Sequence, residues 1–184
     1  MSEIFLETNN SKRIMDRARK VTKNGFNLVI AGTPGSGKSA IAEELARELK
    51  QDGIPVVDIM AGVGDNRTGF YLKMLLKELD PDTKVPGAIE LKFKEIRKIF
   101  LSSFVHRRRV VLIVDEAQNI NLSTIRGLKN IREQSRIVHD GKVHYMLSII
   151  FFCKNYRNFL DNFVSKDPGD RFLMEEMERL EDTE

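Results

Sequence analysis

Residues 32–39 read GTPGSGKS and match the phosphate-binding pattern G-x-x-x-x-G-K-[ST] at every fixed position. An apolar run, FNLVIA, comes directly before the pattern, and a helix-forming run, SAIAEELARELK, follows it. Glycines allow successive main-chain N–H groups to point inward, and the N-terminus of the following helix also favours an anion. We therefore expect this loop to hold the phosphates of ATP. The loop consists of Gly32, Thr33, Pro34, Gly35, Ser36, Gly37, Lys38 and Ser39.

A second motif, VVLIVDEAQ, occupies residues 110–118. An apolar run that ends in two carboxylates is typical of a buried strand that presents Asp115 and Glu116 at its end. We expect Asp115 and the Ser39 hydroxyl to hold Mg²⁺, while Lys38 reaches the β- and γ-phosphates. Glu116 would be the general base for an attacking water, which favours hydrolysis over simple nucleotide retention. The alternative is a strand that ends in a surface acidic turn, and the phosphate loop upstream favours the catalytic interpretation.

Four other residues are candidates for catalysis. A polar sensor usually follows the strand next to the acidic pair, and we assign it to Asn155, with Lys154 as the competing candidate. Asn155 could instead simply cap the next helix. A charge-stabilising arginine is often supplied by a neighbouring subunit, and we assign it to Arg171, with Arg157 as the alternative. Either arginine could also be an ordinary surface residue.

The hydrophobic pattern predicts the framework that brings these residues together. Helical patterns occupy residues 10–24, 39–50, 69–79, 88–104, 121–136 and 156–164, and β-rich runs occupy 26–31, 54–60, 110–114 and 143–153. The segment 171–180 fits either a last strand or a helix. Strands that alternate with helices predict an α/β fold, a three-layer sandwich with a mostly parallel five-stranded sheet. Ligands of such sheets bind at the carboxyl ends of the strands, where the candidate residues fall.

The composition favours one soluble domain in a reducing cytoplasm. The 184 residues are 41% hydrophobic and 31% charged, and no apolar run is long enough to span a membrane. The first ten residues do not resemble a signal peptide. The one cysteine, Cys153, predicts no disulfide, and three scattered histidines predict no zinc site. We divide the domain into an N-terminal helix (10–24), a nucleotide-binding core (26–160) and an acidic C-terminal segment (161–184).

The charge of the chain is uneven. Residues 161–184 carry nine acidic and three basic side chains, which gives this segment a net charge of −6. Because the net charge of the whole chain is +3, the other residues together carry a net charge of +9. A basic body is typical of a DNA-binding ATPase, although many proteins that bind no nucleic acid share it.

The chain resembles the AAA+ ATPases in the order of its motifs. A helix is followed by the phosphate loop, DEAQ, the helix LSTIRGLKNI and a β-rich run. Within them, the chain is most similar to the MuB/TnsC transposition regulators and the related ExeA/GspA-type secretion ATPases, over roughly residues 10–180. The resemblance implies ATP contacts at Gly35, Ser36, Gly37, Lys38, Ser39 and Ala40, and magnesium binding and catalysis at Asp115 and Glu116. It also implies an ATP-dependent ring or helical filament whose site is completed between subunits.

Two departures from the family pattern are visible. The family commonly has Gly-Gln or Gly-Asn after the sensor strand, where this chain has Lys154 and Asn155. The family also has a helical lid domain after the core, and here we expect the lid to be absent or greatly reduced. Both departures affect how a nucleotide would be sensed and retained.

Basic and polar side chains suggest where double-stranded DNA would be contacted. Phosphate contacts need Lys, Arg, Asn or Thr and carry little sequence information. We assign them to Asn66, Arg67, Thr68 and Lys73. A second basic stretch comprises Lys92, Lys94, Arg97, Lys98, Arg107, Arg108 and Arg109. Phe93, Phe100 and Phe104 lie among these at helical spacing, so we expect them to be core residues rather than stacking platforms for bases.

We therefore expect an oligomerising, DNA-binding AAA+ ATPase that selects transposition targets or recruits a transposase. One alternative is a helicase-loader-like AAA+ protein that acts on single-stranded DNA. Another is a protein-directed ATPase of secretion or signalling without a DNA role. A small-molecule kinase is disfavoured, because such enzymes rarely carry two acidic residues at this strand end.

Overall fold

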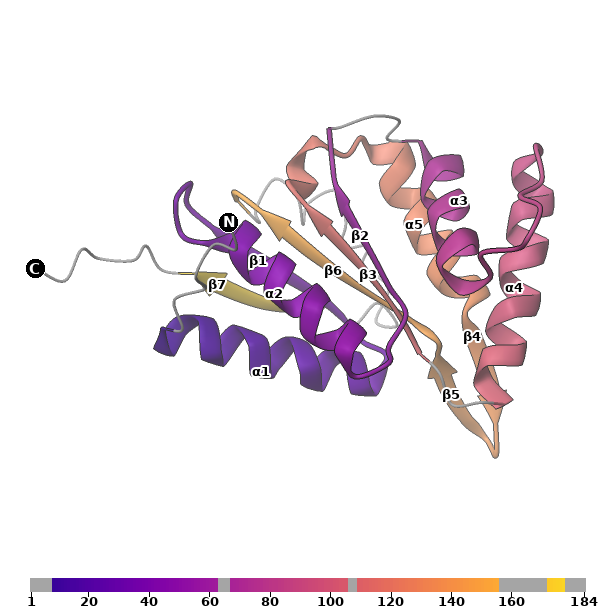
Figure 1. Cartoon of the computed structure of the whole chain (residues 1–184), viewed down its shortest axis with the longest axis horizontal. Coiled ribbons are helices and arrows are strands. Elements are labelled where there is room, and N and C mark those ends of the chain that lie inside the picture. Colours follow the sequence, from indigo (N-terminus) through magenta and orange to yellow (C-terminus); the bar gives the residue numbers. More distant parts are fainter. Residues whose placement is uncertain (1–7, 63–66, 106–108, 156–171, 178–184) are drawn as a thin grey trace, which may run out of the picture.

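The computed structural model describes residues 8–62, 67–105, 109–155 and 172–177. Its elements alternate between strands and helices along most of the chain (Figure 1). The helices are α1 (Asn9–Asn24), α2 (Lys38–Gln51), α3 (Thr68–Leu79), α4 (Ile89–Val105), the short 3₁₀ helix η1 (Ala117–Asn119) and α5 (Leu122–Gln134). The strands are β1 (Asn27–Gly32), β2 (Val56–Met60), β3 (Val110–Asp115), β4 (Arg136–His139), β5 (Lys142–Tyr145), β6 (Leu147–Cys153) and β7 (Phe172–Met177).

Five parallel strands form the central sheet, in the order β2-β3-β6-β1-β7. Helices α1 and α2 cover one face of the sheet, and α3, α4 and α5 cover the other (Figure 1). The fold is therefore the three-layer α/β sandwich with a five-stranded parallel sheet that the sequence predicts. Because all five strands run in the same direction, their carboxyl ends meet along one edge of the sheet.

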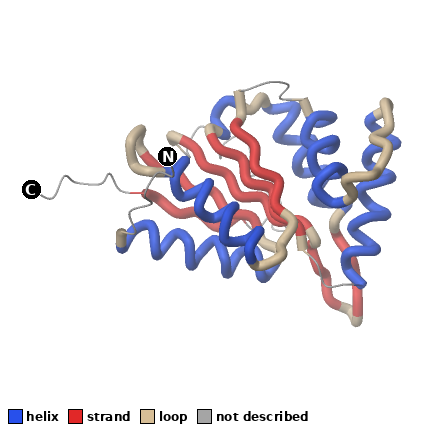
Figure 2. Tube along the Cα trace, viewed as in Figure 1, coloured by secondary structure: helices blue, strands red, loops and turns tan. Residues whose placement is uncertain are grey.

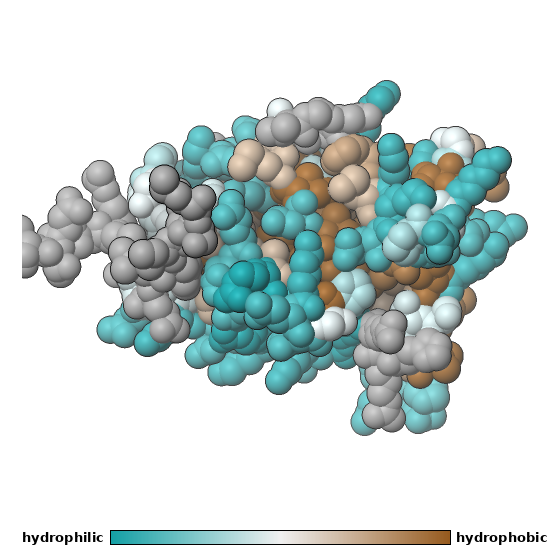
Figure 3. All heavy atoms as spheres, in the orientation of Figure 1, coloured by the Kyte–Doolittle hydropathy of each residue, from teal (hydrophilic) through white to brown (hydrophobic). Residues whose placement is uncertain are grey.

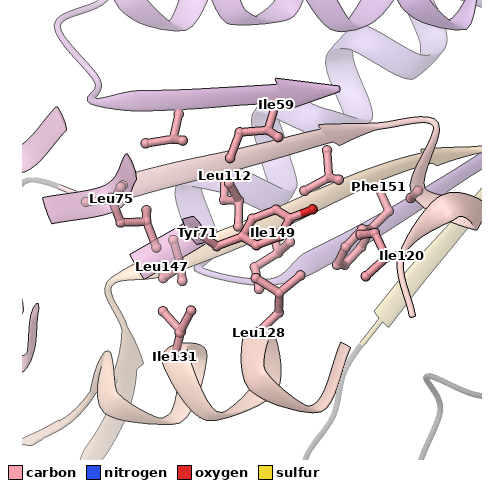
Figure 4. Packing of buried hydrophobic residues seen from close by; sticks show 14 of the residues in the cluster. Ile59, Tyr71, Leu75, Leu112, Ile120, Leu128, Ile131, Leu147, Ile149 and Phe151 are labelled. Carbon is pink, nitrogen blue, oxygen red and sulfur yellow. The ribbon is translucent and has the colours of Figure 1, made fainter. Parts of the chain in front are cut away.

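The two cores follow the alternation of side chains along each buried strand. Neighbouring residues of β3 illustrate this: Leu112 packs toward α3 and α5, and Ile113 packs toward α1 and α2. Figure 4 shows the larger of the two clusters, in which Tyr71 of α3 and Leu128 of α5 lie over the sheet. Figure 3 shows hydrophobic residues in the strip between the two helical layers and also on the side where α3 and α4 lie.

The region before β6 differs from the sequence prediction. The single β-rich run predicted at 143–153 is two strands, β5 and β6, which separate at Met146 and belong to different sheets. The strand β5 pairs with β4 in an antiparallel hairpin (Figure 2), so the predicted helix at 121–136 ends earlier, at Gln134. Asp140 and Gly141 form the turn with φ angles of 49° and 70°, as a tight hairpin turn requires.

Other boundaries agree with the sequence more closely. The segment 171–180, open between strand and helix, contains the edge strand β7 beside β1. The helix predicted at 156–164 lies outside the described residues. Of the helices that the structure describes, none has the length and apolar character needed to cross a membrane.

Candidate active site

The phosphate-binding loop connects β1, which is buried along its whole length, to α2. Gly35 and Gly37 have φ angles of 81° and 83°, in the left-handed region that side chains with a Cβ rarely adopt. Gly37 is also the N-cap of α2 and provides no side-chain acceptor to the first turn of the helix. The N–H groups of that turn are therefore available to an anion at the positive end of the helix.

The beginning of the loop lies in a narrow space. A Cβ added to Gly32 would be 2.7 Å from the Ser36 hydroxyl and 2.8 Å from the Cβ of Met177 in β7. Both distances are shorter than real contacts allow, so only glycine fits here without movement of the loop or of β7.

Lys38 lies inside the loop and is only 7% exposed. Its Nζ donates to the carbonyl oxygens of Gly32 and Thr33, at 2.8 Å each, and to the Ser36 hydroxyl at 3.3 Å. Burial lowers the pKa of Lys38, and the negative charges of Glu116 and Asp115 partly oppose this effect. The ammonium group is thus held by the loop and faces the acidic pair.

The acidic pair ends β3. Asp115 is 5% exposed, and its Oδ1 accepts a 2.8 Å hydrogen bond from the main-chain N–H of Glu116. Glu116 has a φ of 49°, an uncommon left-handed conformation for a residue with a side chain. The chain therefore changes direction between the two residues. Asp115 remains buried at the end of the strand, while the Glu116 side chain keeps 29% of its surface exposed.

Among the described residues, Lys154 and Gln118 contact the Glu116 carboxylate. The Nζ of Lys154, just after β6, lies 3.3 Å from its Oε2, and the side-chain amide of Gln118 donates to the same oxygen. The Gln118 Oε1 in turn accepts a 3.1 Å hydrogen bond from the main-chain N–H of Lys154. We refer to this set of contacts between Glu116, Gln118 and Lys154 as the Gln118 bridge.

The order of the strands explains why residues far apart in sequence meet here. Strand β6 lies between β1, which leads into the loop, and β3, which leads into the acidic pair. Lys154 at the end of β6 is consequently close to both, and its positive charge contributes to lowering the pKa of Lys38. The structure thus brings together Lys38, Asp115, Glu116 and Lys154, all of which the sequence identifies as candidates.

The available oxygen ligands suit Mg²⁺. This ion typically takes one or two carboxylates and completes its shell with water and substrate phosphates. Asp115 offers a buried carboxylate at the strand end, and Ser39 offers an exposed hydroxyl in the first turn of α2. Within the described part of the chain, no group of three or more His, Cys, Asp or Glu side chains forms a metal site of its own. The residues therefore fit an ion that arrives with a nucleotide.

Asn155, the assigned sensor, is exposed and directly follows Lys154. Its main chain hydrogen-bonds the thiol of Cys153, which is fully buried at the end of β6. Burial raises the pKa of this thiol to about 11, so Cys153 is a packing residue at neutral pH. Lys154, the competing sensor candidate, contacts the acidic pair through its Nζ, which lies 3.3 Å from the Oε2 of Glu116.

Three of the four residues assigned to DNA are described, and they lie in or next to α3. Arg67 is the N-cap of α3, and Lys73 is exposed on this helix. Thr68 packs closely against Gly127 of α5, because a Cβ added to that glycine would be 1.9 Å from the Thr68 hydroxyl. Asn66 lies outside the described residues, as do both arginines proposed to act between subunits, Arg157 and Arg171.

The second basic stretch is partly described. Lys92, Lys94, Arg97 and Lys98 belong to α4, Arg109 precedes β3, and Arg107 and Arg108 lie outside the described residues. Arg109 donates to the carbonyl oxygens of Thr22 and Lys23 at the end of α1. Of the phenylalanines, Phe100 is fully buried, and Phe93 and Phe104 pack against the same core, as predicted.

Gln118 is the residue that sequence reasoning missed. It stands two positions after Glu116 in the quoted motif, and its amide offers one donor and one acceptor side. No feature of the sequence indicates its partner Lys154, because that contact depends on the pairing of β3 with β6.

Comparison with protein families identifies one match. The sequence model of a family described as AAA domain matches residues 22–159, which include the phosphate loop and the acidic pair. Among proteins with curated descriptions, none matches this chain.

Solved structures of similar fold include three relevant here. ORC2 of Aeropyrum pernix, in ADPNP-ADP complexes, is 14% identical with a TM-score of 0.65 over 96% of this chain and 48% of that one. Cdc6p of Pyrobaculum aerophilum is 14% identical with a TM-score of 0.60, over 94% of this chain and 47% of that one. Drosophila ORC bound to DNA is 16% identical with a TM-score of 0.58, over 83% of this chain and 37% of that one. This chain thus spans half or less of the length of these proteins.

Proposed function

Because this chain belongs to the AAA domain family and is a P-loop ATPase, we propose that it uses ATP to assemble on duplex DNA. In this proposal it is a target-selection or transposase-recruitment factor of DNA transposition. One observation supports the hydrolysis of ATP in this proposal: Glu116 lies beside Asp115 at the end of β3. Only β6 separates β3 from β1, the strand that leads into the phosphate loop. A carboxylate that remains partly exposed there can accept a proton from water.

The chain's own residues divide the work of hydrolysis. Lys38 exchanges its contacts with the loop carbonyls for the β- and γ-phosphate oxygens, and the first-turn N–H groups of α2 bind the remaining charge. Glu116 takes the proton of a water that attacks the γ-phosphorus, while the bond to the β-phosphate oxygen breaks and ADP leaves. Asp115 and Ser39 would hold Mg²⁺, which supplies neutralisation of the phosphate charge.

The site is completed between subunits in this proposal. An arginine from a neighbouring copy would stabilise the charge that develops on the transferred phosphate, and Arg171 is the first candidate, followed by Arg157. Such a requirement couples hydrolysis to a ring or filament, so that assembly and turnover depend on each other.

Three features support an action on DNA. The exposed Lys73 and the neighbouring Arg67 lie on or next to α3, and the body of the chain carries excess positive charge. The DEAQ motif and the helix that follows it are similar to those of the MuB/TnsC regulators. Among the solved structures of similar fold, one is Drosophila ORC bound to DNA.

A second candidate function is a helicase-loader or replication-initiator role. It is favoured by the fold similarity to ORC2 and Cdc6p, which extends over nearly the whole chain. The loader role differs from the first candidate in its expected DNA substrate, because a helicase loader of the predicted kind acts on single-stranded DNA.

The experiment is an ATPase assay with no DNA, with duplex DNA and with single-stranded DNA, paired with electron microscopy in a non-hydrolysable ATP analogue. Glu116→Gln is the control, because it keeps the shape of the side chain but removes the base. Turnover stimulated by duplex DNA, together with rings or filaments on that DNA, is the expected result. Preference for single strands would favour the loader role. ATP turnover without a DNA response or assembly would contradict both and leave a protein-directed ATPase.

A further inference from the structure

We propose that Gln118 is a positioning residue that fixes the Glu116 carboxylate to the end of β6 and thereby determines the rate of hydrolysis. The inference rests on the hydrolysis proposed above and adds a residue to it. Gln118 lies in η1, two residues after Glu116. Its side-chain amide donates to Glu116 on one side and accepts from the main chain of Lys154 on the other.

The orientation of the Gln118 amide follows from its partners. A carboxylate can only accept hydrogen bonds, and a main-chain N–H can only donate them. Only one of the two possible amide orientations satisfies both, with Nε2 toward Glu116 and Oε1 toward Lys154. Both ends of the side chain are thus used, and the amide cannot rotate without losing both contacts.

The Gln118 bridge connects the segments that follow β3 and β6, after the last paired residues of the two strands. The pairing of strands β3 and β6 extends as far as Val114 and Phe151. Past this point Gln118, in η1, connects the end of β3 to Lys154. Strand β6 is also paired with β1, the strand that leads into the phosphate loop. The Gln118 side chain therefore links the position of Glu116 to the position of that loop.

Glu116 needs such a restraint, since its backbone is in the left-handed conformation and its side chain is partly exposed. A general base must lie within hydrogen-bond reach of the attacking water, and an error of about 1 Å in such a position costs roughly 100-fold in rate. The ion pair with Lys154 is a second restraint, but it depends on a flexible side chain that is 52% exposed. Gln118 is neutral and is held by hydrogen bonds at both ends of its amide, so it fixes the position of the Glu116 carboxylate more precisely than the ion pair with Lys154 does.

The variants separate the two ends of the bridge. Gln118→Leu keeps the approximate size and removes both contacts. Gln118→Glu keeps an acceptor for Lys154 but can no longer donate to Glu116, and it brings two carboxylates together. Gln118→His restores one donor and one acceptor on a neutral ring and serves as the rescue variant. Asn119→Leu is the matched control, because Asn119 lies on the same turn but donates to the carbonyl of Ala61.

Steady-state kinetics and equilibrium binding of a fluorescent ATP analogue test the proposal. We expect Gln118→Leu to lower kcat about 10- to 100-fold with analogue affinity within twofold of wild type. Gln118→Glu should lower kcat at least as much, whereas Gln118→His and Asn119→Leu should stay close to wild type. In a Glu116→Gln background, Gln118→Leu should cause no further loss, because it acts through Glu116.

Two results would overturn the proposal: an unchanged kcat in Gln118→Leu, or affinity and kcat that fall together, as a general loss of structure predicts. If the wild-type chain binds ATP without hydrolysing it, the proposed function fails, and the bridge is then tested without turnover. In that case the side-chain ¹⁵N resonance of Gln118 should shift in Glu116→Ala but not in Asn119→Leu, and the absence of a shift rejects the bridge.

Discussion

The Nζ of Lys38 lies 2.8 Å from the carbonyl oxygen of Gly32, so the lysine at the end of the phosphate loop donates to the residue at its beginning. The same ammonium also contacts Thr33 and Ser36. The loop is therefore already closed around this charge, and the positive group that a phosphate would meet is in place.

Replacement of Lys38 should abolish tight ATP binding while the chain stays folded. In Lys38→Met we expect about 100-fold weaker binding, the equivalent of one or two charge-assisted hydrogen bonds. Titration with a fluorescent ATP analogue measures the loss, and circular dichroism confirms the fold. Lys50→Met, at the far end of α2, is the control and should bind as wild type does. Equal binding by both variants would show that Lys38 does not meet the phosphates.

Lys73→Ala should weaken duplex DNA binding through one lost phosphate contact. We expect the slope of log K against log salt concentration to decrease in magnitude by about 0.9, with little dependence on the DNA sequence. Fluorescence anisotropy at several salt concentrations measures the slope. Lys142→Ala, on the β4–β5 hairpin, is a control of equal charge change. An identical decrease in both variants would indicate a general effect of net charge instead of a contact on α3.

Gly127→Ala should destabilise the chain even though alanine favours helices. The new Cβ would lie 1.9 Å from the hydroxyl and 2.5 Å from the methyl carbon of Thr68, so α3 and α5 must move apart. Overpacking of this kind costs about 1–3 kcal/mol, which should appear in urea unfolding as a lower midpoint with an unchanged slope. Thr68→Gly in the same chain should recover part of the loss, because it removes all three clashing atoms. Gly87→Ala, at a glycine with open space around it, should be nearly neutral.

Cys153 should make the stability of the chain depend on alkaline pH. Burial raises its thiol pKa from 9.0 to about 11, so the folded state holds a proton that the unfolded state loses first. This contribution is complete below pH 9 and is lost as the pH rises toward 11, by at most about 1.4 kcal/mol per pH unit. Cys153→Ala lacks the thiol, so its unfolding free energy should fall less than that of wild type between pH 9 and pH 10.5. Parallel curves for the two chains would mean that the thiol does not titrate in this range.

Local patterns predicted the elements that carry chemistry. The phosphate loop and the acidic pair are each recognisable from a few consecutive residues, because the apolar run, the glycines and the charged ends are contiguous in sequence. Strand β3 and helix α2 lie where the pattern predicts them for the same reason. The three-layer arrangement then follows from the alternation of strands and helices.

Contacts between distant residues were not predictable in this way. The hairpin of β4 and β5 was missed because its second strand continues almost without interruption into β6, although the Asp140–Gly141 turn was a visible signal. Thr68 was assigned to DNA as a polar loop residue, and only the packing of α3 on α5 shows that it lies against Gly127. Gln118 was missed because its partner comes from another strand.

The pairing of Gly32 with Met177 also has a consequence for how the chain folds. Strand β7 is the last of the described strands along the chain, yet it is the neighbour of the first, so the other three strands of the sheet lie between them in sequence. Contacts of such large sequence separation form late, since the entropy of closing the loop must be overcome first. During synthesis the glycine-rich segment would leave the ribosome well before Met177, the residue that a side chain at position 32 would meet. A nascent chain should therefore gain its ability to retain a nucleotide in one late step rather than gradually.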